Sequence, residues 1–109
     1  MKISRLQHEC HKIAVSKGWW DEKRNIGEAL CLIHSEVSEA LEEYRRGIDL
    51  QEIYFDGDGK PQGFPIELAD TVIRLLDLCG GLRIDLEDAI KVKMKFNKSR
   101  SKRHGNKLA

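Results

Sequence analysis

The chain has 109 residues, of which 19 are Lys or Arg and 18 are Asp or Glu, so its formal net charge is only +1. This balance argues against a strongly basic nucleic-acid binder and against an acidic, solvating protein. A single domain of this size buries only about two-thirds of the surface that its unfolded chain exposes. Its core is therefore thin, and a partner subunit would add to it.

The cysteines and the lack of long apolar runs bear on the compartment. Three cysteines are present, an odd number without any Cys-x-x-Cys pair: Cys10, Cys31 and Cys79. Unpaired thiols of this kind are typical of a reducing environment. The sequence does not open with the basic-then-apolar pattern expected of a leader peptide, and it has no apolar run of about 18 residues, the length that crosses a membrane. We therefore expect a soluble cytoplasmic protein.

The first half of the sequence predicts two helices. Apolar residues recur at steps of three and four over residues 3–17, and Gly18 is expected to end this helix. The same period continues over residues 25–46, where Asn25 can cap the start and Gly47 can stop the end. The apolar stripe of this second helix contains Leu30, Val37 and Leu41.

The second half predicts a punctuated loop and two further helices. Glycines and prolines over residues 48–65 indicate a loop with a small hairpin around residues 56–60. A third helix is expected from about Pro65 to Cys79, ended by Gly80-Gly81, and a fourth over residues 86–98. The main core stripe expected for the third helix is Leu68, Val72, Leu75 and Cys79. The sequence thus predicts an all-α, four-helix bundle over residues 1–100, followed by a basic tail over residues 101–109.

Two pairs of acids have the same spacing on neighbouring helices. Glu36 and Glu39 lie three residues apart in the second helix, and Glu67 and Asp70 lie three apart in the third. Each pair shares a helix face, and an unpaired carboxylate in a partly dry groove is costly. Hard oxygen ligands that converge from two helices suit Mg²⁺ or Mn²⁺. The alternative for the second helix is a solvated, Glu-rich face, but acids within the apolar third helix favour a metal site, with Arg74 as its supporting arginine.

This order of acids resembles that of the MazG-like, all-α nucleoside triphosphate pyrophosphohydrolases, which also include the dimeric dUTPases and the dCTPases. The pattern is Glu-x-x-Glu, then 27 residues, then Glu-x-x-Asp. Three stretches are similar to the family: "NIGEALCLIHSEVSEALEEYRRG", "GKPQGFPIELADTVIRLLDL" and "KMKFNKSRSKRHGNK". The resemblance implies Mg²⁺-dependent cleavage of a nucleoside triphosphate between its α and β phosphates, giving the monophosphate and pyrophosphate. It also implies a homodimer or a homotetramer.

The carboxylates can be given roles within this chemistry. A bound divalent cation neutralises phosphate charge and lowers the pKa of a bound water molecule. A carboxylate that is not fully committed to the cation could accept the proton of that water. Glu36 is the preferred proton acceptor, and Glu39 is nearly as good a candidate.

Further residues are candidates for holding the substrate. On the last helix Lys93, Asn97 and Arg100 lie at steps of four and three and resemble the Lys-x-x-x-Asn-x-x-Arg segment of the family, which implies a phosphate clamp. The alternatives are a solvated basic tail and, ranked lowest, nucleic-acid binding. The resemblance also implies that His11 and Trp20 line a pocket for the base, although a tryptophan at a helix junction is more often a core residue.

A different class of function is also compatible with the sequence. The chain could be a non-catalytic helical adaptor whose acids bind a structural ion or a basic partner. The third helix is apolar on a second side, which contains Ala69, Ile73 and Leu76, and we expect subunits to pair through that side.

Overall fold

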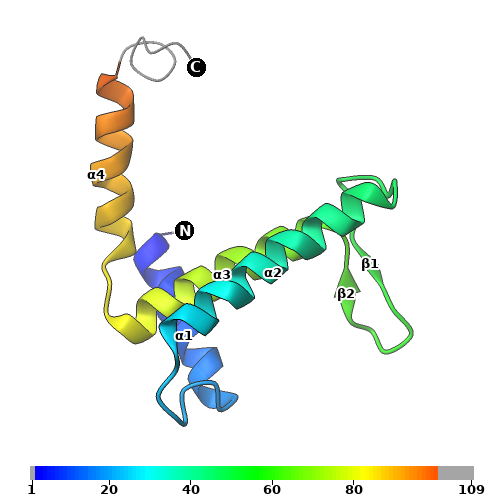
Figure 1. Ribbon diagram of the computed structural model, residues 1–109, viewed down its shortest axis with the longest axis horizontal. Helices are drawn as coiled ribbons and strands as arrows, with labels where there is room; N and C mark the ends of the chain where they lie inside the picture. The colour runs from blue at the N-terminus through cyan, green and yellow to red at the C-terminus, as the bar shows by residue number, and fades with distance from the viewer. Residues whose placement is uncertain (1, 101–109) are drawn as a thin grey trace.

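The computed structural model describes residues 2–100 and is almost entirely helical (Figure 1). Its elements are α1 (Ile3–Ser16), α2 (Ile26–Arg45), β1 (Tyr54–Phe55), β2 (Pro61–Gln62), α3 (Phe64–Leu82) and α4 (Leu86–Ser99). The all-α prediction is confirmed, and so is the small hairpin between the second and third helices. The basic tail predicted for residues 101–109 lies outside the described residues. Within the described range, no helix has both the length and the apolar character needed to span a bilayer.

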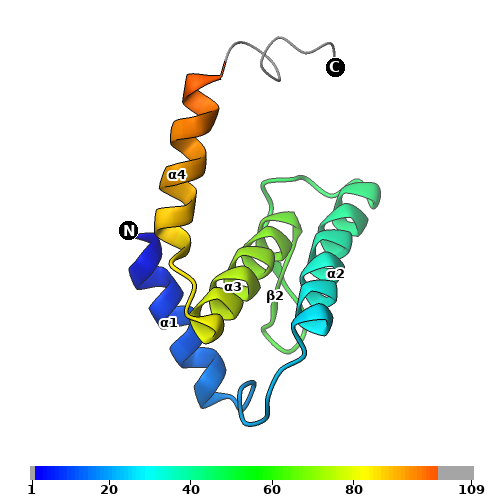
Figure 2. The ribbon, with the colours of Figure 1, turned by 60° about the vertical axis from the view of Figure 1, so that its left-hand side comes forward.

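Helix α3 is the central element of the fold. It lies between α1 and α2 and packs extensively against both (Figure 2). Ala29 and Ile33 of α2 meet Leu78 of α3 in a small buried cluster, and Trp20 covers its edge. Leu76 is the most deeply buried large side chain, with 2% of its surface exposed. The packed unit therefore consists of three helices, with α1 and α2 on either side of α3.

Local sequence signals account for where the helices begin. The side chain of Asn25 accepts a hydrogen bond from the backbone N–H of Glu28 at 2.9 Å, and Asp85 accepts one from Asp88 at the same distance. These are N-caps, which satisfy donors that the first turn leaves without a partner. Pro65 stands in the first turn of α3, where its missing N–H costs nothing. The predicted starts of these helices are confirmed to within a residue.

The predicted end of α3 is wrong. Gly80 and Gly81 do not stop the helix, which continues to Leu82 and ends at Arg83 in a left-handed conformation with φ of 58°. A Cβ atom on Gly80 would lie only 2.7 Å from Cβ of His11, and one on Gly81 would overlap the ring of Trp20. The two glycines are therefore sites of close packing, where α1 and the following loop come nearest to the α3 backbone.

Helix α4 does not complete a four-helix bundle within one chain. It packs mainly against α1 and then projects away from α2 and α3 (Figures 1 and 2). Residues 91–100 are all exposed. The predicted bundle is thus a three-helix unit with an extended fourth helix.

The expected core stripes of the two long helices are largely exposed. On α3 only Cys79 of the predicted stripe is buried, and Leu76, which was expected on the second apolar side, is buried within the chain as well. The exposed apolar residues of these stripes are Leu30, Val37 and Leu41 on α2 and Leu68, Val72 and Leu75 on α3. The prediction failed because helical periodicity identifies apolar faces but not which neighbour covers each of them.

The close approach at Gly81 leads to a stability prediction. Gly81→Ala should lower the free energy of unfolding by about 1–3 kcal/mol, because the added methyl group must displace Trp20. Gly57→Ala is the control, since a Cβ there meets nothing within 4 Å, and it should change stability by less than about 0.5 kcal/mol. Chemical denaturation of both variants measures the difference. Equal stability of the two variants would contradict the packing role of Gly81.

Candidate metal centre

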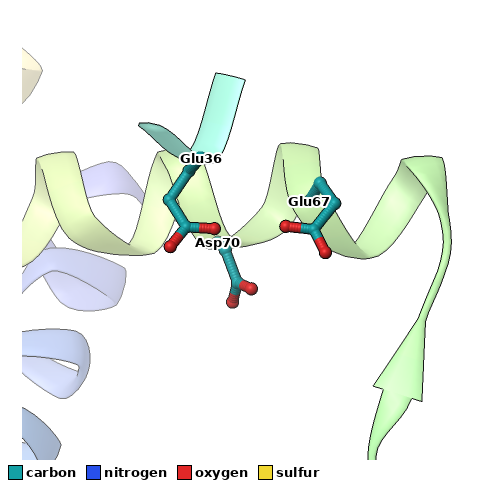
Figure 3. Close-up of side chains that lie close together, drawn as sticks. All are labelled: Glu36, Glu67 and Asp70. Carbon is teal, nitrogen blue, oxygen red and sulfur yellow. The ribbon is translucent and has the colours of Figure 1, made fainter. Parts of the chain in front are cut away.

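Three carboxylates from two helices converge on one side of the molecule. Glu36 comes from α2, and Glu67 and Asp70 come from successive turns of α3 (Figure 3). One oxygen from each residue lies within 4.8 Å of the others, and all three side chains are partly buried. This is an arrangement of hard oxygen donors on packed helices, with a donor set that fits Mg²⁺ or Mn²⁺.

Glu39, the fourth acid expected at this site, lies outside the group of three. It is exposed, one turn further along α2 than Glu36. Its charge nevertheless contributes to the raised pKa of Glu67, so it remains close enough to act on the cluster through space. The structure thus brings together three of the four predicted acids and leaves Glu39 beside them.

Two of the three clustered acids, Glu67 and Asp70, have raised pKa values. Burial, followed by the adjacent Glu36 carboxylate, raises the pKa of Glu67 to about 7. Burial and the charge of Glu36 also raise the pKa of Asp70, against smaller opposing effects of Arg74 and Lys60. Without a cation the site therefore favours proton uptake, as expected where like charges converge in a partly dry environment.

Arg74 supplies the positive charge nearest to Glu36. Its Nε donates a hydrogen bond to Glu36 Oε1 at 2.9 Å, so the arginine reaches from α3 to α2. The sequence predicts Arg74 as the supporting arginine of the acid site. Its closest partner in the structure is the acid that faces Arg74 across the helix pair.

Asp77 belongs to a separate, buried network. Its Oδ1 accepts from Trp20 Nε1 at 2.8 Å and lies 2.9 Å from His11 Nδ1, while its Oδ2 accepts from Arg24 at 3.1 Å. His11 and Trp20, the residues expected to contact a base, thus turn their polar groups toward α3. Their edge-to-face contact, with ring centroids 5.2 Å apart, adds to this packing.

A cavity of about 220 Å³ runs from this network toward the acids. Trp19 lies at its wall with half of its surface exposed, and two guanidinium groups lie over its ring. The guanidinium carbon of Arg74 is 5.6 Å from the ring centroid and that of Arg24 is 5.9 Å from it. The remaining wall is mixed in character: Cys10, Ile13, Ala14, Lys17, Ala29, Ile33, Asp70, Ile73 and Asp77.

The predicted phosphate-binding residues are exposed: Lys93 and Asn97 lie on α4, and Arg100 follows its last residue as the C-cap. Lys93 Nζ and the Arg100 guanidinium lie over the ring of Phe96, at 4.9 and 5.5 Å from its centroid, so they share one side of the helix with it. Because α4 projects away from the pair α2 and α3, these residues and Asn97 are not gathered at the acids of their own chain.

Sequence reasoning missed two acid contacts. The Glu36–Arg74 pair could have been found by asking which acid on α2 faces an arginine at the middle of α3. The second contact is made by Glu43, a buried acid that accepts hydrogen bonds from the Tyr54 hydroxyl at 2.9 and 3.1 Å. No local sequence pattern predicts this contact, because it depends on how the hairpin packs against α2.

Comparison of the chain with protein-family models, with curated proteins and with solved structures found no match.

The raised pKa of Glu67 leads to a prediction about pH. An acid with a folded-state pKa above its unfolded value stabilises the fold at low pH and loses this contribution as pH rises. In EDTA, the melting temperature of Glu67→Gln should therefore rise relative to that of the wild type as pH increases from about 5 to about 7, the folded-state pKa of Glu67, and the difference should be constant above it. Glu42→Gln, an exposed acid of the same charge, is the control. A constant difference across this range would contradict the assignment.

Proposed function

We propose that this chain is a divalent-cation-dependent hydrolase that cleaves nucleoside triphosphates between the α and β phosphates, releasing the monophosphate and pyrophosphate. The observation that carries the proposal is the convergence of Glu36, Glu67 and Asp70 from two packed helices. The resemblance of these motifs to the MazG-like pyrophosphohydrolases supplies the reaction. The unpaired thiols of all three cysteines are compatible with a cytoplasmic location.

The proposed cation, Mg²⁺ or Mn²⁺, would be held by these three carboxylates. Bound there, it would neutralise triphosphate charge and lower the pKa of a water molecule. The raised pKa values of Glu67 and Asp70 support this part of the proposal, because a bound cation would offset the burial and the repulsion by Glu36 that raise them. Metal binding should therefore release protons near neutral pH.

Glu39 becomes the better candidate for accepting the proton of the attacking water. Glu36 already accepts a hydrogen bond from Arg74 and belongs to the group of three, whereas Glu39 stands outside that group. A proton acceptor must lie close to the cation without being fully committed to it. Between the two candidates from the sequence, geometry now favours Glu39 over Glu36.

The base would lie in the cavity beside Trp19. This cavity reaches Asp70 at one end, so a nucleotide with its phosphates at the acids could extend its base along the ring. His11 and Trp20 would then contribute indirectly, through the Asp77 network that holds the loop carrying Trp19. An exposed aromatic face stacks on any base, which leaves the preferred base open.

The competing proposal is a non-catalytic adaptor that uses the same acids for a structural ion or a basic partner. The acid cluster supports both proposals, because charge and donor type are the same for either role. Turnover separates them, since an adaptor has no hydrolysis to lose.

The first functional test is turnover of a panel of ribo- and deoxyribonucleoside triphosphates with Mg²⁺. Wild type should release monophosphate and pyrophosphate, and Asp70→Ala should lower kcat at least about 100-fold while the circular dichroism spectrum stays unchanged. Glu42→Ala, an exposed acid on α2, is the matched control and should keep its activity. Release of diphosphate and phosphate, or equal turnover of Asp70→Ala, would refute the proposed reaction.

The proposed enzyme would act as a homodimer or a homotetramer. The exposed apolar residues of α2 and α3 support this, because a second copy could cover Val37, Leu41, Leu68 and Val72. The side of α3 that the sequence predicted for pairing is less suitable, because its Leu76 is already buried within the chain. An oligomer would also give α4 a role. Because α4 projects from its own chain, Lys93, Asn97 and Arg100 could bind the phosphates at the acids of a second copy.

Mixing two inactive variants tests whether α4 serves a second copy. Asp70→Ala removes one acid from the cluster of its own chain, and Arg100→Ala removes one residue from the clamp that its chain offers. In a mixed dimer one site would keep both parts, so re-annealed equal mixtures should recover about one quarter of wild-type activity. Light scattering must give the same oligomeric mass for the mixture as for the wild type. No recovery in mixtures of confirmed mass would show that α4 acts within its own chain.

A further inference from the structure

One charge-assisted hydrogen bond fixes Glu36 in place. Arg74 Nε donates to Glu36 Oε1 at 2.9 Å, and the two side chains are 31% and 14% exposed. An ionised carboxylate has about four lone-pair sites on its two oxygens, and this bond uses one of them. Figure 3 shows one oxygen of Glu36 turned toward Glu67. The acid can thus be held by Arg74 and still present an oxygen to the other two acids.

Arg74 is in turn held by an aromatic ring. Its guanidinium carbon lies 5.6 Å from the centroid of Trp19, within the distance at which a cation is attracted to a ring face. The same ring lies 5.9 Å from the guanidinium of Arg24, which donates to the buried Asp77 at 3.1 Å. A continuous set of contacts therefore runs from the buried network to the acid cluster, although Trp19 touches none of the acids through a hydrogen bond.

We propose that Arg74 is a positioning residue of the metal centre: held over Trp19, it orients Glu36 so that an oxygen faces Glu67 and Asp70. The inference rests on the proposed function, because it assigns Arg74 a role toward the cation that these acids would hold. The positive charge of Arg74 by itself would oppose binding of a cation nearby. Its contribution must therefore come from its fixed N–H direction and its flat face, which a lysine does not reproduce.

Binding of Mn²⁺ without nucleotide, followed by electron paramagnetic resonance, tests this role. Arg74→Lys keeps the charge and Trp19→Leu changes no charge, so neither alters the net charge of the site. Both should raise the Kd for Mn²⁺ about 10-fold, as expected when a partner that orients a metal ligand is lost. Trp19→Phe keeps an aromatic face and should stay close to the wild type. Unchanged Mn²⁺ affinity in Arg74→Lys and Trp19→Leu would overturn the proposal.

A second measurement needs no metal. In EDTA, the melting-temperature shifts of Trp19→Leu and Glu36→Gln should be non-additive in the double variant, because both changes break one set of contacts. Trp19→Leu combined with Glu42→Gln is the control pair and should be additive. Additive shifts in the first pair refute the positioning of Glu36 even where the wild type binds Mn²⁺. A wild type that binds no Mn²⁺ refutes the proposed metal centre itself.

Discussion

The carboxylate of Asp77 is the interaction on which the arrangement of the helices depends. Its side chain is only 10% exposed, and a buried carboxylate is tolerated only where donors replace the lost water. The partners are His11 of α1 and two residues of the loop before α2, Trp20 and Arg24. The hydrogen bonds to this one carboxylate on α3 therefore also position α1 and the connection to α2. The small core around Leu78 packs against Trp20 of that connection.

The charged residues along α3 belong to two groups of contacts because the helix meets two neighbours. Near its N-terminus, Glu67 and Asp70 gather with Glu36 of α2. Near its C-terminus, Asp77 pairs with α1 and the loop. Arg74 stands between them and pairs with Glu36, while its guanidinium shares the ring of Trp19 with Arg24. The spacing of three, four and three keeps the row on one side of the helix, so the buried network and the acid cluster are joined along it.

The sequence predicted what depends on local chemistry and failed where the outcome depends on a neighbouring segment. Caps and periodicity predicted all four helices, and the acid spacing predicted that Glu36, Glu67 and Asp70 lie close to one another. Gly80 and Gly81 look like a helix stop, but the proximity of His11 and Trp20 decides their role. The exposure of Leu68, Val72 and Leu75 could not be predicted for the same reason, because an apolar stripe does not indicate which neighbouring segment covers it.

The choice between the two tryptophans illustrates the same limit. Both stand in the connection after α1, and nothing in their order distinguishes a core residue from a cavity residue. The missing side chain at Gly81 leaves space for only one large ring, and Trp20 occupies it with its N–H on Asp77. Trp19 is consequently left at the cavity wall beside Arg74, with half of its surface exposed. Because Trp20 packs against Gly81, Trp19 is the aromatic ring that lies beside Arg74.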